Sequence, residues 1–156
     1  MTRSRAAMAA RDEGTKRGDI VTNDLFMRRV LRTTAVMNFG GALLFAFPGS
    51  LLGQLAGLPA PAPPLYTVFI AFLVALFGAT YAWLARQPRI DRPLVAFSAI
   101  GKTGFFVVVS LCWLFGEVPA RAVLTAAGDL VFAAIFVWWL VAGSSVPEYA
   151  VRPDAA

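Results

Sequence analysis

Apolar residues gather in four long runs along the chain, and short polar segments separate them. The runs cover residues 30–47, 65–85, 94–115 and 122–142. Each comes close to or exceeds the roughly 18–20 residues that a helix needs to cross about 30 Å of hydrocarbon. None shows the strict alternation of a barrel strand. The pattern predicts an all-α integral membrane protein, a bundle of four transmembrane helices at about residues 28–47, 65–86, 94–115 and 121–142.

Polar segments flank this transmembrane domain, which we place at residues 25–143. Residues 1–24 are polar, mixed in charge and without apolar periodicity, so we expect a disordered cytoplasmic tail there. Residues 144–156 are expected to form a second cytoplasmic tail. In the first connection, the apolar stretch "LLGQLAGL" is too short to span, and we expect it to lie along the outer interface or to tuck back against the bundle. The following proline run favours an extended spacer.

The charged residues predict an orientation. Of the 14 Lys and Arg residues, eight precede or begin the first helix, whereas the two connections on the opposite side carry only Arg121. By the positive-inside rule, both termini and the middle connection are cytoplasmic. The net charge of +5 is therefore explained by topology, and nucleic acid is not an expected partner. We expect six arginines beside the helix ends to contact lipid headgroups: Arg28, Arg29, Arg32, Arg86, Arg89 and Arg92.

Composition narrows the possible chemistry. The chain is 58% hydrophobic, has a single cysteine, Cys112, and has no histidine. One cysteine cannot form an internal disulfide or a dithiol pair. Without histidine, the usual haem ligand, the commonest zinc ligand and the commonest proton shuttle are missing. We therefore expect no cofactor and no metal, and we regard an enzyme as the least favoured class.

The stretch "AFSAIGKTGFF" contains Gly101-Lys102-Thr103, which looks like the end of a phosphate-binding loop. Such a loop needs a glycine five positions before its glycine-lysine pair, and a strand leading into it. This chain has Ala96 at that position, within a continuous apolar run. The phosphate-loop interpretation is therefore excluded, and Lys102 becomes a charge inside a membrane helix.

Asp129 is the second charge within an apolar run, and an ion pair with Lys102 is the obvious hypothesis. Counted from the predicted helix ends, however, their α-carbons differ in depth by about 9 Å. Their side chains also tilt apart, because each leans toward the start of its own helix. A direct pair would need a shifted register. A water-linked pair or separate partners are the alternatives.

Asn38 and Tyr81 extend this polar set to all four predicted helices. Asn38 matches the depth of Lys102, and Tyr81 lies slightly nearer the cytoplasmic end. Glycines and alanines beside these residues would let the helix backbones approach closely. Asn38, Tyr81, Lys102 and Asp129 therefore form a candidate polar centre, one residue from each helix. We find no internal repeat: the first and second helix pairs share length but no residue pattern that we recognise, so an inverted-repeat transporter core within one chain is not supported.

The layout of residues 28–142 resembles the small four-helix bacterial membrane proteins of the DoxX-like kind. The chain is also similar to small bacterial membrane proteins with a lysine in the third helix and an aspartate in the fourth. These resemblances concern architecture, so they transfer no functional residue. They imply a multi-pass protein of the bacterial inner membrane.

Three functions compete on this reading. The first is an accessory or assembly subunit of a membrane complex, in contact with another membrane subunit or with its own copies. The second is an oligomeric binder or transporter of a lipid-like or anionic small molecule, which would use the polar centre. The third is an intramembrane enzyme using Asp129 and Tyr81 for acid–base chemistry. We favour the first, with the second as its alternative.

Overall fold

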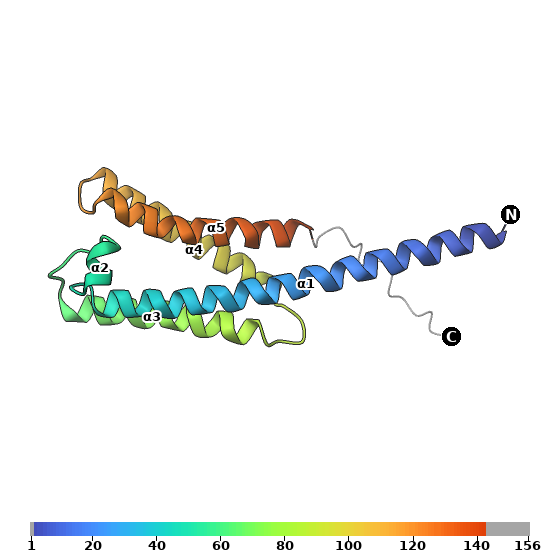
Figure 1. The fold of residues 1–156 in the computed structure, drawn as a ribbon, viewed down its shortest axis with the longest axis horizontal. Helices are drawn as coiled ribbons and strands as arrows, with labels where there is room; N and C mark the ends of the chain where they lie inside the picture. The colour runs from blue at the N-terminus through green and yellow to red at the C-terminus, as the bar shows by residue number, and fades with distance from the viewer. Residues whose placement is uncertain (1, 143–156) are drawn as a thin grey trace.

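The computed structural model describes residues 2–142, and within them the chain is helical, with no strand. Figure 1 shows the elements in order. They are α1 (Thr2–Ala46), α2 (Leu51–Leu55), α3 (Pro64–Leu84), α4 (Arg92–Leu114) and α5 (Ala120–Ala142). The last three differ from the expected ranges by no more than two residues at either end. The tail placed at residues 144–156 lies outside the described residues.

Local sequence explains where these helices begin and end. Pro64 occupies the first turn of α3, where its missing N–H costs no hydrogen bond. The side chain of Asp91 accepts a hydrogen bond from the Leu94 N–H and so caps α4. At the other end of α4, Gly116 adopts a φ of 77°, a left-handed conformation that glycine reaches without strain. The Glu117 N–H then closes the turn on the Cys112 carbonyl.

Helix α1 is longer than we expected, because it begins at Thr2 and runs through the segment placed in a disordered tail at residues 1–24. The extension projects beyond the other helices (Figure 1). The segment contains four alanines and four arginines, which are good helix formers. Extending an existing helix also avoids the costly nucleation step. The expectation rested on missing apolar periodicity, which bears on packing rather than on helix formation.

Three helices are long and apolar enough to cross a membrane: α3, α4 and α5. Helix α1 is not among them within the described part of the chain. Its apolar part is short, because Arg29 and Arg32 precede it and Asn38 interrupts it.

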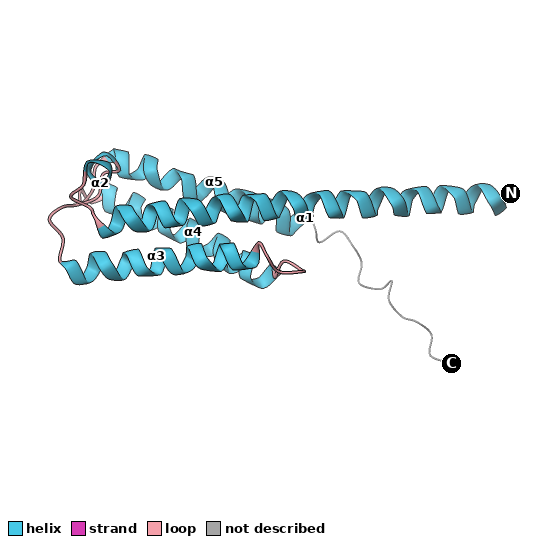
Figure 2. Cartoon of the chain, turned by 60° about the horizontal axis from the view of Figure 1, so that its bottom comes forward, coloured by secondary structure: helices cyan, strands magenta, loops and turns pink. Residues whose placement is uncertain are grey.

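The helices form two antiparallel hairpins, α1 with α3 and α4 with α5 (Figure 2). In the first hairpin the backbones approach closely at Gly78. A Cβ there would lie 3.3 Å from both the Ala35 carbonyl oxygen and the Asn38 Cβ. The hairpins meet through a buried core in the half of the molecule where α1 projects, which includes Leu31, Tyr81 and Phe136.

The two hairpins repeat one set of contacts, so the expectation that the chain has no internal repeat was wrong. Thr34 and Ser98, 64 positions apart, are both buried and both donate to the carbonyl four residues earlier. Arg28 and Arg92, at the same separation, both donate to a carbonyl near the end of the antiparallel partner helix. Two further buried pairs also lie 64 positions apart: Leu31 with Val95, and Ala35 with Ala99. In the second helices of the hairpins, three buried pairs lie 55 positions apart: Ala71 with Ala126, Tyr81 with Phe136, and Leu84 with Trp139. This repeat is parallel rather than inverted, because both hairpins start at the same end of the molecule.

The connection after α1 folds back onto the bundle, which is one of the two arrangements we considered. The Arg121 side chain donates to the Gln54 carbonyl at 3.1 Å, and the Thr125 hydroxyl donates to the Ala56 carbonyl at 3.3 Å. Gly57, with φ of 81°, lies against the backbone of Ala122. Helix α2 therefore covers the start of α5.

Candidate functional site

The register of the second hairpin explains how Lys102 reaches Asp129. Arg92, at the start of α4, donates to the Leu140 carbonyl near the end of α5. Lys102 lies ten residues beyond Arg92, and Asp129 lies eleven residues before Leu140. At about 1.5 Å per residue, both α-carbons lie about 15–17 Å from this common level. The two charges therefore share one depth.

Lys102 and Asp129 form a direct ion pair between Nζ and Oδ1. This is the shifted-register arrangement, and the depth difference of about 9 Å that we derived from the predicted helix ends was wrong. The error arose because the depths were counted from the predicted helix ends, whereas the Arg92–Leu140 contact marks the register in the structure. Lys102 is 5% exposed and Asp129 is 19% exposed. The lysine is thus enclosed, and the carboxylate keeps a limited opening.

Asn38 joins the ion pair to the first hairpin. Its Oδ1 accepts a hydrogen bond from Lys102 Nζ at 3.3 Å, and its Nδ2 donates to the Val74 carbonyl at 3.3 Å. Asn38 and Lys102 occupy matching positions in the repeat, 64 residues apart. The amide therefore links α4 to both helices of the first hairpin.

Aromatic rings enclose the lysine on its remaining sides. Its Nζ lies 5.5 Å from the centre of the Tyr81 ring and 5.7 Å from that of Phe132, distances at which a ring face attracts a cation. Tyr81 is 1% exposed, and its hydroxyl interacts with the Ser98 side chain. The charge is therefore held by one carboxylate, one amide and two rings.

The structure brings all four residues of the expected polar centre together, one from each of α1, α3, α4 and α5. Sequence reasoning missed Phe132 and the Val74 carbonyl. Phe132 lies three residues after Asp129 and so on the same face of α5, which is a usable signal. A backbone carbonyl carries no residue signal, so nothing in the sequence pointed to Val74.

The arginines expected at the headgroups fall into two groups. Arg28 donates to the carbonyls of Ala85, Gln87 and Pro88, at 2.6–3.0 Å, so its guanidinium is used inside the protein. Arg92 is likewise bound to the Leu140 carbonyl and lies over the Trp139 ring. Both arginines thus bind the ends of partner helices. The remaining four are exposed: Arg29, Arg32, Arg86 and Arg89.

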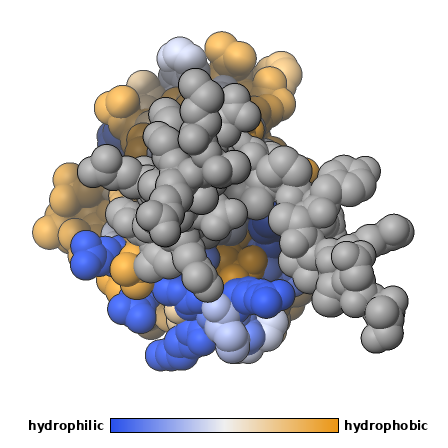
Figure 3. Space-filling view, turned by 90° about the vertical axis from the view of Figure 1, so that its right-hand side faces the viewer, coloured by the Kyte–Doolittle hydropathy of each residue, from blue (hydrophilic) through white to orange (hydrophobic). Residues whose placement is uncertain are grey.

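Hydrophilic surface gathers on one side of the molecule's end when it is viewed from the side where α1 projects (Figure 3). Hydrophobic surface is visible along the upper and left-hand edges of this view. Within the described residues, no group of three or more His, Cys, Asp or Glu side chains could hold a metal ion.

The polar centre is an internally neutralised pair, which can join helices without any ligand. To act on a ligand, it would first have to open.

The chain matches no protein-family model, no curated protein and no solved structure.

Proposed function

We propose that this chain is a four-span protein of the bacterial inner membrane, with both termini in the cytoplasm, and an accessory or assembly subunit of a membrane complex. A fourth span in α1 is supported by its packing along α3, which is apolar enough to cross the membrane. A helix packed lengthwise on a spanning helix shares its depth. The orientation is supported by the gathering of arginines at one end of the hairpins.

The accessory role is carried by one observation: the two membrane charges neutralise each other inside the chain. Lys102 is paired with Asp129 and Asn38, so neither charge is left over for a substrate. Buried charges that satisfy each other can fix the arrangement of helices. The ion pair then holds α4 and α5 in one register, and the hydrogen bond from Lys102 to Asn38 joins them to the first hairpin. The apolar outer faces remain for lipid and for a partner subunit.

The second candidate is a binder or transporter of a lipid-like or anionic small molecule, and the 19% exposure of Asp129 favours it. In membrane transporters, sites often lie at midplane between structural repeats, and this centre lies between two hairpins that repeat one another. An anion that displaced Asp129 from Lys102 would open the centre.

Native mass spectrometry of the tagged protein, extracted gently from its own membranes, tests the two functions. The key variant is Lys102→Met with Asp129→Leu, which removes both charges and leaves neither unpaired. A matched control is Ile100→Met, on the exposed face of α4. We expect a stoichiometric second polypeptide to co-purify with all three forms. A small-molecule adduct that is lost only in the double variant would contradict the accessory role and support the binder.

A further inference from the structure

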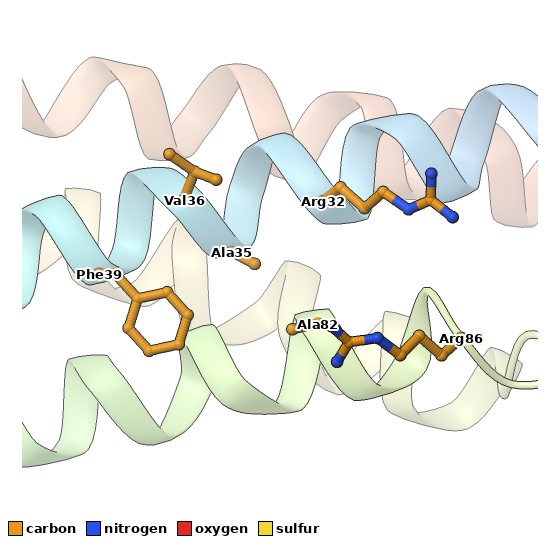
Figure 4. Close-up of a pocket in the computed structure, with 6 residues that line it drawn as sticks. All are labelled: Arg32, Ala35, Val36, Phe39, Ala82 and Arg86. Carbon is orange, nitrogen blue, oxygen red and sulfur yellow. The ribbon is translucent and has the colours of Figure 1, made fainter.

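A groove on the outside of the first hairpin is lined by residues other than the four of the polar centre. It runs between α1 and α3, near the end where the arginines gather, and has a volume of about 220 Å³. Figure 4 shows its lining, which is Arg32, Ala35, Val36, Phe39, Ala82 and Arg86. The lining is basic at one end and apolar along the rest.

The two arginines have no partner of their own in the described part of the chain, neither a hydrogen bond nor an ion pair. They lie on opposite sides of the groove, and the Arg86 side chain turns back along α3 toward Ala82 (Figure 4). The nearby carboxylate of Asp91 already caps α4. Two guanidinium groups without an acidic partner form a site for an anion, and arginine binds phosphate oxygens with two parallel hydrogen bonds.

The apolar part of the groove suits a hydrocarbon chain. Val36 is 72% exposed and Phe39 is 44% exposed, although both follow Arg32 along α1 toward the middle of the bundle. A molecule that offers an anion beside the arginines and an apolar chain beside Val36 and Phe39 matches both parts. A phospholipid has this arrangement, and its phosphate lies at the depth of the helix ends.

Arg28 removes an obstacle to anion binding at this place. The carboxyl end of a helix carries partial negative charge, which repels anions. At the end of α3 the carbonyls of Ala85, Gln87 and Pro88 accept hydrogen bonds from Arg28. Their negative charge is thereby compensated, and Arg86 can offer its positive charge to a ligand.

The second hairpin lacks this basic groove, although it repeats the other contacts. The position that matches Arg32, 64 residues later, is Ala96. The position that matches Arg86, one residue beyond Leu140, is Val141. Arg32 and Arg86 are therefore not required to build a hairpin of this kind. Arg28 and Arg92 differ from them, because they make the matching contact in each hairpin.

We propose that this groove is a binding site for one anionic phospholipid, whose phosphate is held by Arg32 and Arg86 and one acyl chain of which lies along Val36 and Phe39. The inference does not rest on the accessory role. It rests on α1 and α3 lying in a membrane with their arginine end at the headgroups.

Lipid binding to the purified full-length protein tests this site. The probe is dioleoyl phosphatidylglycerol, titrated in detergent and followed by native mass spectrometry, with dioleoyl phosphatidylcholine and inorganic phosphate as comparisons. The test variant is Arg32→Gln with Arg86→Gln. The matched control is Arg29→Gln with Arg89→Gln, which removes two exposed arginines from the same end. We expect the test variant to weaken the first phosphatidylglycerol site about fivefold for each arginine lost, and the control to leave it within twofold.

Three outcomes would overturn the proposal. Equal weakening by the two double variants would mean a general attraction of anionic lipid to a basic surface. Equal affinity for phosphatidylcholine would mean that the arginines do not select the headgroup. Displacement of the lipid by inorganic phosphate at similar concentration would mean a phosphate site without an acyl chain. Phe39→Ala, which keeps both charges, should weaken the lipid and leave any phosphate binding unchanged.

Discussion

At the scale of single residues, Lys102 and Asp129 matter most, because each is costly in the membrane without the other. Lys102→Met leaves the largely buried Asp129 carboxylate without its cation, and we expect it to destabilise the protein by about 3 kcal/mol. Asp129→Leu should have a similar effect. The double variant should lose much less than the sum, since replacing a buried pair by apolar side chains is often neutral.

A double-mutant cycle measures this coupling, with the thermal unfolding of the four proteins followed in detergent. The exposed Ile100→Met variant controls for a changed methionine content in α4. Additive losses in the double variant would show that the two side chains do not stabilise each other, and the ion pair would then have no role in holding the hairpins.

The residue types of the polar centre could be predicted from the sequence, and the contact between its charges could not. A lysine and an aspartate inside apolar runs stand out in any hydropathy profile. Their relative depth depends on the offset between α4 and α5, which differs from the offset of the helix ends. That offset is marked by the hydrogen bond from Arg92 to Leu140, and a helix-length count carries no information about it.

At the scale of elements, Arg28 ties α1 to the end of α3 and to the turn before α4. Its guanidinium donates to three carbonyls that no helix hydrogen bond satisfies. We expect Arg28→Ala to destabilise the protein by about 2 kcal/mol, about the value of one hydrogen bond from a charged donor, because these three contacts are only part-buried or exposed and water can replace most of them. Faster amide hydrogen exchange at residues 85–91 should accompany this loss.

Arg29→Ala is the matched control for that prediction. Arg29 is the next residue in α1, it is exposed, and it has no hydrogen bond or ion pair within the described residues. Its loss should change stability by less than about 0.5 kcal/mol. If the two variants behaved alike, the carbonyl contacts of Arg28 would contribute nothing beyond surface charge.

Helix positions were predictable because turns and caps are local. Pro64, Pro93 and Asp91 mark the helix starts within a residue or two of where they occur. The length of α1 and the repeat of contacts between the hairpins were harder to predict from the sequence. The repeat pairs residues of similar size but different type, such as Tyr81 with Phe136, so it emerges from burial rather than from sequence identity.

At the scale of the whole molecule, the number of spans and their direction determine on which side of the membrane each connection between helices lies. Within residues 2–142, three helices qualify by hydropathy, and α1 is the exception because of Arg29 and Arg32. If α1 also crosses, then the connection after it lies outside, together with the turn between α4 and α5. If α1 stayed on the cytoplasmic side, its packing along the whole of α3 would have to be given up.

Cysteine labelling in intact cells distinguishes these topologies. In a Cys112→Ala background, single cysteines at Gly49, Gln87 and Glu117 report on the three connections. We expect a membrane-impermeant maleimide to label Gly49→Cys and Glu117→Cys directly, and Gln87→Cys only after the membrane is permeabilised. Direct labelling of Gln87→Cys, with Gly49→Cys and Glu117→Cys labelled only after permeabilisation, would leave three spans and contradict a crossing by α1 from a cytoplasmic N-terminus. Because Asn38 contacts Lys102 from α1, that result would also remove α1's contribution to the polar centre.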